Sequence, residues 1–273
     1  MTIHIWIWLQ HRKGNIEPES LGLINEAVQA LSKENINGTI TALAFGPDFL
    51  SAFDEIEGYG VTRIIYSPKE QLQSYQGELF AAVLYDLFLE ESPSLIYMTQ
   101  TPQTADLAPR LAALTGSALV TKAMDFKILQ ENDAVAVRPR SSGYLFERLS
   151  LGREYPPIIC FDPSVLTLPE PNTHCGKATL VRYSPKINEK CLKTKLTQVI
   201  EAAGRELDLE EADIIVAGGR GLGNEDQFKL IHELAQLLDA PVGGTRPVID
   251  AGILPYERQI GQTGKIVGPR LLI

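Results

Sequence analysis

Cysteine is scarce in this sequence of 273 residues, and the three that occur, Cys160, Cys175 and Cys191, form no CxxC pair. Because zinc sites and iron–sulfur clusters are built from closely spaced cysteines, neither kind of site is predicted. His174 stands beside Cys175, but neighbouring side chains on a strand point to opposite faces, which weakens a shared metal site. This cysteine usage indicates a reducing intracellular setting, and we expect a cytoplasmic protein.

A long apolar run is also missing. The N-terminal stretch MTIHIWIWLQHRKGN has a short apolar run with its positive charge after it, which is the wrong order for a signal peptide. The run is too short to cross a membrane, so it predicts a first buried strand, and no membrane insertion is expected.

Positive charge is in deficit, since Lys and Arg total 25 against 34 Asp and Glu, a formal net charge of -9. Proteins that bind the phosphate backbone concentrate Lys and Arg on one face, so a nucleic-acid partner is not expected. A single nucleotide remains compatible with this charge, because one small anion needs only local positive groups. The acidic surface serves solubility or, alternatively, a basic partner.

Several motifs of nucleotide-dependent and hydrolytic enzymes are absent from the N-terminal part. It contains no SGGxDS-type pyrophosphate loop, no P-loop GxxxxGK[ST] and no GxSxG elbow. His11 and Arg12 follow the first strand, where an α/β domain binds ligands, but no Gly-rich loop accompanies them. The sequence therefore does not indicate a hydrolase.

Strand-like and helix-like segments alternate from the N-terminus, with strands predicted over 3–9, 39–45, 63–66 and 95–98 and helices over 21–32, 49–57, 77–91 and 104–115. This rhythm predicts a parallel sheet covered by helices on both faces. From 118 to about 202 the segments are mostly strands, which extend the first sheet or form a small antiparallel layer beside it. The α/β rhythm restarts after Gly204, so we predict domains over 1–203 and 204–273.

A Gly-rich turn in the second domain is the most informative local feature. The predicted strand 213–217 runs directly into GGRGLG, and a helix is predicted over 225–238. A strand that enters a Gly-rich turn and a helix N-terminus offers backbone N–H groups to an anion, and Arg220 adds a planar charged donor. The alternative is a strand-to-helix turn that uses glycine for structural reasons alone.

Two further loops add polar groups at predicted strand ends. GGTRPVIDAG places Thr245 and Arg246 after a short strand, at the end where open α/β sheets bind ligands. The alternative for Arg246 is a surface ion pair with Asp250. In QIGQTG, glycines flank Gln262 and Thr263, which favours contact with a heteroaromatic ring edge or a phosphate; the alternative is a tight turn before a strand over 265–267.

These three loops, in this order, resemble the alpha subunit of the electron transfer flavoproteins. The matching segment is ADIIVAGGRGLGNEDQFKLIHELAQLLDAPVGGTRPVIDAGILPYERQIGQTGKIVGP, and HRKGN and TPQTADLAPRLAALTGSALVTKAMDF extend the similarity to essentially the whole chain. The resemblance implies an α/β fold: an N-terminal parallel-sheet domain of the adenine nucleotide alpha hydrolase-like type, with a strand-rich extension and without its own nucleotide site. A doubly wound FAD-binding domain is implied to follow it.

The resemblance also implies a flavin site, formed by Arg220, Thr245, Arg246, Ile260, Gly261, Gln262 and Thr263. Arg246 is implied to lie near the isoalloxazine ring, where a fixed positive charge favours the anionic reduced states and raises the potential. Gln262 and Thr263 are implied to donate hydrogen bonds to the polar ring edge or N5, and Arg220 to hold the flavin or cover one face. Family members usually carry Ser at the position of Thr245.

The end of the sequence departs from the family pattern. Family chains continue with an SGAxQH segment, a strand with an Asn-Lys-Asp-like turn and a final helix, which contact the ribityl chain, pyrophosphate and adenosine. This sequence stops at GPRLLI. We therefore expect an incomplete FAD-binding domain, either as a fragment or as a shortened variant that a partner completes.

The leading functional hypothesis is an electron carrier rather than an enzyme with a substrate of its own. The resemblance implies a heterodimer with an electron transfer flavoprotein beta subunit, which relays electrons through FAD between a dehydrogenase and an acceptor such as a quinone oxidoreductase. The alternative is a flavin-free interaction or scaffold subunit with a vestigial FAD domain. A self-contained nucleotide-hydrolysing enzyme is disfavoured by the missing phosphate loops.

Overall fold

In the computed structural model the chain forms two compact units, residues 1–197 and 198–273. The structure describes residues 2–12, 14–129, 133–152, 155–168, 177–187, 192–194, 196–198, 209, 212–222, 225–261, 263–265 and 267–273. The predicted domain boundary between residues 203 and 204 lies outside these residues.

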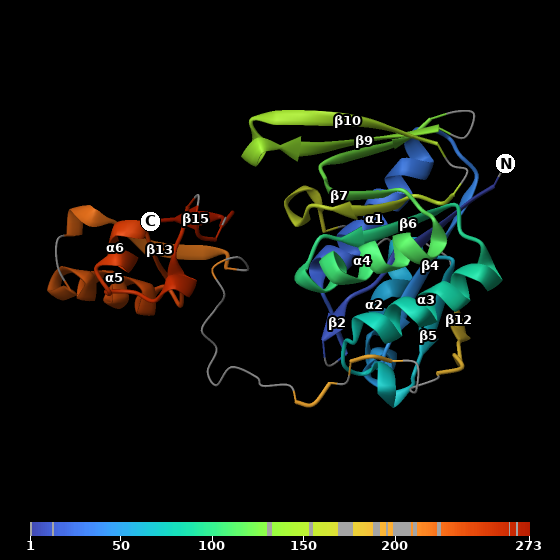
Figure 1. Ribbon diagram of the computed structural model, residues 1–273, viewed down its shortest axis with the longest axis horizontal. Helices are drawn as coiled ribbons and strands as arrows, with labels where there is room; N and C mark the ends of the chain where they lie inside the picture. Colours follow the sequence, from blue (N-terminus) through green and yellow to red (C-terminus); the bar gives the residue numbers. More distant parts are fainter. Residues whose placement is uncertain are drawn as a thin grey trace. The chain divides into compact units, whose positions relative to one another are not determined.

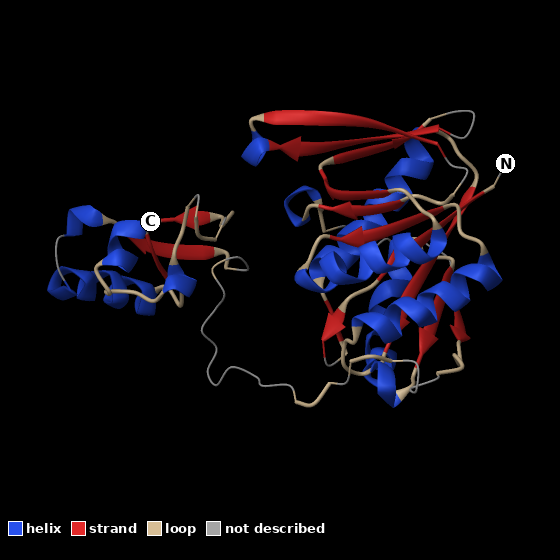
Figure 2. Ribbon diagram, viewed as in Figure 1, coloured by secondary structure: helices blue, strands red, loops and turns tan. Residues whose placement is uncertain are grey.

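The N-terminal unit alternates strands and helices along most of its length (Figures 1 and 2). Its helices are α1 (Pro18–Lys33), α2 (Phe53–Ile56), α3 (Gly77–Glu91) and α4 (Pro102–Thr115). Its strands are β1 (Ile3–Trp8), β2 (His11–Arg12), β3 (Asn15–Ile16), β4 (Gly38–Phe45), β5 (Arg63–Ser67), β6 (Leu95–Thr99), β7 (Leu119–Ala123), β8 (Asp125–Ile128), β9 (Asp133–Arg140), β10 (Leu145–Gly152), β11 (Ile158–Phe161) and β12 (Thr179–Arg182).

Seven parallel strands form the main sheet, in the order β12-β5-β4-β1-β6-β11-β7. Side chains of β1 alternate between two cores: Ile5 and Ile7 pack with residues of α1, whereas Trp6 and Trp8 pack with residues of α3 and α4. A strand buried on both faces is apolar at nearly every position, which explains the continuous apolar run of β1. The predicted parallel sheet with helices on both faces is confirmed.

The strand-rich stretch both extends the sheet and adds a layer. Strands β7, β11 and β12 join the parallel sheet, while β8, β9 and β10 form a three-stranded antiparallel sheet in the order β10-β9-β8. Phe126 and Ile128 of β8, together with Leu151 of β10, belong to the same core as α1. The antiparallel layer therefore covers part of the face on which α1 lies, and β10 forms its edge.

Polar side chains occupy the carboxyl edge of the main sheet between β1 and β6, where the strand order reverses. Gln10 Nε2 donates to Gln103 Oε1 at 2.9 Å, and Thr101 Oγ1 donates to Gln10 Oε1 at 3.1 Å. The backbone N–H of Gln10 donates to Ser20 Oγ at 2.9 Å. Open α/β sheets bind ligands at this kind of edge. Here the hydrogen-bonding groups of Gln10 are engaged with neighbours in the chain.

Within the first 202 residues, two predicted elements differ from the structure. The predicted helix over 49–57 is broken into η1 (Pro47–Ala52), α2 and η2 (Glu57–Tyr59). Glycines bound this segment, with Gly46 at φ 111 and Gly60 at φ 93, conformations that end regular helix. The predicted strand near 196–202 is absent from residues 196–198, and its remainder lies outside the described residues.

Cys160 lies within β11 and is fully buried, which raises the pKa of its thiol to about 12. Cys175 and Cys191 lie outside the described residues. Among the described residues there is no group of three His, Cys, Asp or Glu side chains suited to a metal ion. None of the helices in the described ranges is both long and apolar enough to cross a bilayer.

An ion pair between β5 and the end of α3 links stability to pH. Arg63 donates from Nη1 and Nη2 to the two carboxylate oxygens of Glu91, at 2.9 and 3.1 Å. These hydrogen bonds hold the pKa of Glu91 below its ordinary value of 4.5. A carboxyl whose pKa is lowered by folding stabilises the fold above its unfolded pKa. That contribution is lost as the pH falls through the folded value.

We expect Glu91→Gln to lower the free energy of unfolding by ~1 kcal/mol at neutral pH. The difference from the unsubstituted chain should shrink as the pH falls below the ordinary value of 4.5 and through the lowered pKa of folded Glu91. Urea unfolding followed by tryptophan fluorescence measures it, because both tryptophans, Trp6 and Trp8, are buried in this unit. The exposed neighbour Glu90, changed to Gln, is the control. A difference that persists unchanged in acid would contradict the assignment.

Candidate functional site

The C-terminal unit is built on a small parallel sheet. Its strands β13 (Ile214–Gly218), β14 (Val242–Gly244) and β15 (Leu271–Leu272) lie in the order β14-β13-β15. Its helices are α5 (Glu225–Leu237) and α6 (Arg246–Asp250), with single turns at η7 (Arg220–Leu222) and η8 (Tyr256–Arg258). The strand, Gly-rich turn and helix predicted from 213 to 238 are present, apart from residues 223 and 224, which lie outside the described residues.

Two glycines let neighbouring side chains approach the strands of this sheet closely. A Cβ on Gly218 would lie 2.2 Å from the ring of Phe228 in α5, and a Cβ on Gly243 would lie 2.3 Å from the side chain of Ile260. Phe228 itself is 1% exposed. Glycine at the two positions therefore allows α5 and the loop around Ile260 to pack directly on the sheet.

Arg220, Thr245 and Arg246 follow the carboxyl ends of two adjacent strands. Gly218 and Gly244 are partners in the register of β13 and β14, so the two loops begin side by side. The backbone N–H of Thr245 donates to the carbonyl of Gly218 at 3.0 Å. All three predicted side chains are exposed to solvent.

Arg246 has a partner within its own helix. Its Nε lies 3.6 Å from Asp250 Oδ2, and the two side chains are 67% and 66% exposed. The surface ion pair considered from the sequence is thus present. Exposed pairs of this kind contribute little to stability, so Arg246 can exchange Asp250 for a ligand anion at small cost.

The loop that carries the other predicted residues begins beside the end of β14. The backbone N–H of Ile260 donates to the carbonyl of Gly244 at 2.9 Å. Gly261 has φ 123, a conformation suited to glycine. The predicted strand over 265–267 is not formed by the described residues, where Lys265 makes one isolated bridge to Ile260. Gln262 lies outside the described residues.

A buried amide positions Thr263. Gln259 is 3% exposed, and its Nε2 donates to Thr263 Oγ1 at 2.7 Å. The hydroxyl of Tyr256 donates to the backbone carbonyl of Thr263 at 2.8 Å. Because Thr263 Oγ1 already accepts from Gln259, its own hydrogen can be donated outward. Sequence reasoning assigned no role to Gln259 or Tyr256, since their positions next to the loop carry no separate signal.

The groups at this edge fit an anionic heteroaromatic cofactor. Arg220 and Arg246 supply planar cationic donors, and Thr263 supplies a positioned hydroxyl. A Cβ added to Gly221 or Gly261 would meet nothing within 4 Å, so the backbone there is open to a ligand. These groups suit the polar ring edge of a flavin or a phosphate.

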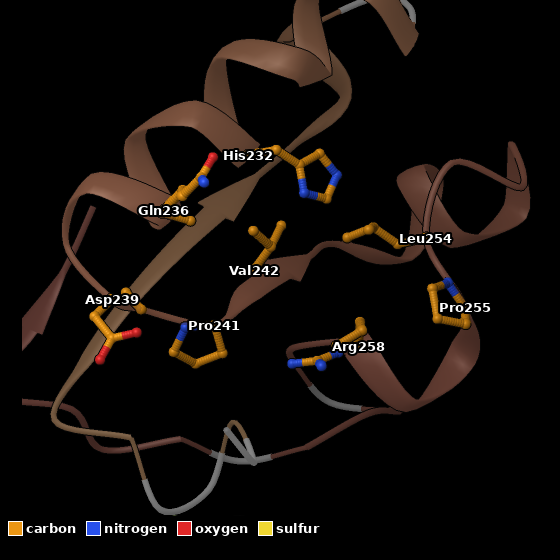
Figure 3. A pocket seen from close by; sticks show the side chains of 10 residues that line it. His232, Gln236, Asp239, Pro241, Val242, Leu254, Pro255 and Arg258 are labelled. Atoms are coloured by element: carbon orange, nitrogen blue, oxygen red, sulfur yellow. The ribbon is translucent and has the colours of Figure 1, made fainter. Parts of the chain in front are cut away.

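A hollow of about 410 Å³ lies at the other end of β14 (Figure 3). His232 and Gln236 of α5 form one side, Arg258 of η8 the other, and Pro241 and Val242 lie between them. It sits at the amino end of β14, and none of the predicted flavin residues lines it.

Comparison with protein families covers both units. Residues 5–188 match the electron transfer flavoprotein domain, and residues 208–273 match the electron transfer flavoprotein FAD-binding domain of alpha subunits. The chain belongs to the electron transfer flavoprotein alpha-subunit family. Its C-terminal unit is accordingly the FAD-binding domain of that family over the residues present.

Individual relatives agree with this membership. The electron transfer flavoprotein subunit alpha of Thermoanaerobacterium thermosaccharolyticum is 30% identical over 270 residues, covering 98% of this chain and 81% of the relative. Protein FixB of Azotobacter vinelandii is 32% identical over 280 residues, covering 99% and 76%. Subunit LctC of a lactate dehydrogenase (NAD(+),ferredoxin) from Acetobacterium woodii is 30% identical over 272 residues, covering 98% and 63%.

Proposed function

We propose that this chain is the alpha subunit of a heterodimeric, cytoplasmic electron carrier. In this proposal it holds FAD, pairs with a beta subunit, and passes electrons from a dehydrogenase to an acceptor such as a quinone oxidoreductase. The observation that carries the proposal is the convergence of three loops at the carboxyl ends of β13 and β14, within the segment that matches the family's FAD-binding domain. Open α/β sheets bind ligands at that edge.

The proposed cofactor-binding residues are Arg220, Thr245, Arg246, Ile260, Gly261, Gln262 and Thr263. Bound FAD supplies the reversible uptake and release of electrons. Arg246 and Arg220 place positive charge at this edge, which favours the more negatively charged, reduced forms of a bound group. Thr263, held by Gln259, donates a hydrogen bond in a fixed direction. Gly261 leaves the backbone open to a flat ring.

The test is the flavin content of the heterodimer. Co-purified with its beta subunit, the protein should show the absorbance bands of oxidised flavin, which bleach on reduction with dithionite. If the flavin is lost during purification, added FAD should restore the bands. A colourless heterodimer that takes up no added FAD would contradict the proposal.

A flavin-free interaction subunit is the second candidate. The observation in its favour is the pairing of Arg246 with Asp250, which accounts for the arginine without any cofactor. In that case Arg246→Ala would leave binding of the beta subunit unchanged, and neither the variant nor the parent heterodimer would carry flavin.

A further inference from the structure

The hairpin of β9 and β10 in the N-terminal unit carries large apolar side chains in solvent. Tyr144 is 82% exposed, Leu145 62% and Phe146 64%. They follow the turn η4 (Ser141–Gly143) that joins the two strands, at one end of the hairpin (Figure 1). Three consecutive exposed side chains of this size, two of them aromatic, are typical of an interaction surface rather than of a solvated loop.

Strand β10 also presents a backbone edge that no other described strand pairs with. β10 is eight residues long and, among the described residues, pairs with β9 alone. Edge strands are normally protected by proline, charged side chains, a bulge or short length, because a free edge accepts another strand. The charged side chains of β10 are Glu147, which is paired with Arg138 and Arg140 of β9, and Arg148. The β10 sequence LFERLSLG contains neither proline nor lysine, and its register with β9 runs without a bulge.

Three arginines lie on β9 and β10 near the apolar end of the hairpin. Arg138 and Arg140 both donate to Glu147, at 2.8 and 2.9 Å, and Arg148 is exposed. Three arginines and one glutamate give this end a local net charge of +2, within a chain of net charge -9. A partner strand with acidic side chains is complementary to it.

We propose that β10 is a docking strand for the beta subunit. An extended segment of the partner, with apolar and acidic side chains, adds antiparallel or parallel to the free edge of β10 and packs over Tyr144, Leu145 and Phe146. Backbone hydrogen bonds supply part of the affinity in strand addition, and side-chain contacts supply specificity. This proposal rests on the heterodimer proposed above and adds where the N-terminal unit engages its partner.

Phe146→Asp tests the apolar contact. Binding of the purified beta subunit, measured by titration calorimetry at fixed salt, should weaken about thirty-fold, as expected for a buried aromatic anchor. Leu89→Asp is the matched control, because Leu89 is 61% exposed on α3 and lies outside the hairpin. It should bind within about twofold of the parent chain. Tryptophan fluorescence confirms that both variants keep the N-terminal fold.

Arg148→Glu tests the charge of the partner strand. Reversing this exposed charge should weaken binding about tenfold at low salt and by less at high salt. Stronger binding by this variant would contradict an acidic partner segment. Hydrogen exchange on the unsubstituted heterodimer gives an independent readout, since amides of β10 should exchange more slowly after the beta subunit is added.

The outcomes separate this inference from the proposed function. If the parent chain does not bind the beta subunit, the proposed heterodimer is overturned, and the proposed role of β10 as a docking strand is overturned with it. If the parent binds, but Phe146→Asp binds equally well and β10 exchange is unchanged, only the docking strand is overturned. A chain that sediments alone as a dimer, and as a monomer after Phe146→Asp, would assign the edge to a second copy instead.

Discussion

Replacing Arg246 by alanine is expected to lower the reduction potential of the flavin in the assembled heterodimer by tens of millivolts. A unit charge about 4 Å away contributes about 1 kcal/mol in water and about 4 kcal/mol at an effective dielectric near 20. With about 43 mV per kcal/mol for one electron, the range is about 40 to 170 mV. Because the Arg246 side chain is 67% exposed, solvent screens its charge and we expect the lower part of this range.

Redox titration of the parent and variant heterodimers measures this shift. Lys229→Gln is the control, since it removes a positive charge of similar exposure, 70%, from α5. Asp250→Asn removes the present partner of Arg246 and should move the potential in the opposite direction. An unchanged potential in Arg246→Ala, or an equal shift in Lys229→Gln, would show that Arg246 does not act on the flavin.

Phe228→Ala is expected to have the largest effect on the stability of the C-terminal unit. Phe228 is 1% exposed and packs with Val248 and Leu254, and deletion of a buried aromatic ring costs about 3–5 kcal/mol. Because the C-terminal unit then unfolds more often, the amides of α5 and β13 should exchange their hydrogens faster. Exchange in the N-terminal unit should stay unchanged. Leu237→Ala, at a position 84% exposed on the same helix, should have almost no effect.

The close approach of Phe228 to Gly218 makes a second substitution informative. Gly218→Ala places a methyl group where the Phe228 ring now lies, and overpacking of this kind costs about 1–3 kcal/mol. Phe228→Leu replaces the ring by a smaller, branched side chain, so the double variant should be less destabilised than the sum of the two single variants. Strict additivity would mean that the ring and the glycine are not in contact.

Much of the fold was predictable because its elements are strongly patterned. The helix over 77–91 and the strand over 63–66 match α3 and β5 closely, since each has continuous apolar spacing between clear turn residues. The structure of segment 49–57 was not predictable in this way, because glycines on both sides limit it to short helical turns despite its apolar side chains. The strands predicted from 118 to about 202 had two possible places, since strand pattern alone does not say which sheet a strand joins.

The candidate site was predictable in part for a similar reason. Thr245 and Arg246 follow a predicted strand directly, so their place at the carboxyl edge followed from topology. The support of Thr263 by Gln259 was not predictable, because it depends on the path of a loop that brings a buried amide back against its own chain. The same holds for β10, whose exposed edge is set by how three strands pair rather than by their composition.

The hydrogen bonds around Gln10 affect how readily the N-terminal unit would take up a small molecule. Gln103, Thr101 and Ser20 already engage this side chain and its backbone at the edge where a sheet of this type binds ligands. A small molecule entering there would have to replace those bonds before making any of its own. We therefore expect this edge of the N-terminal unit to favour its own hydrogen bonds over those offered by a small molecule.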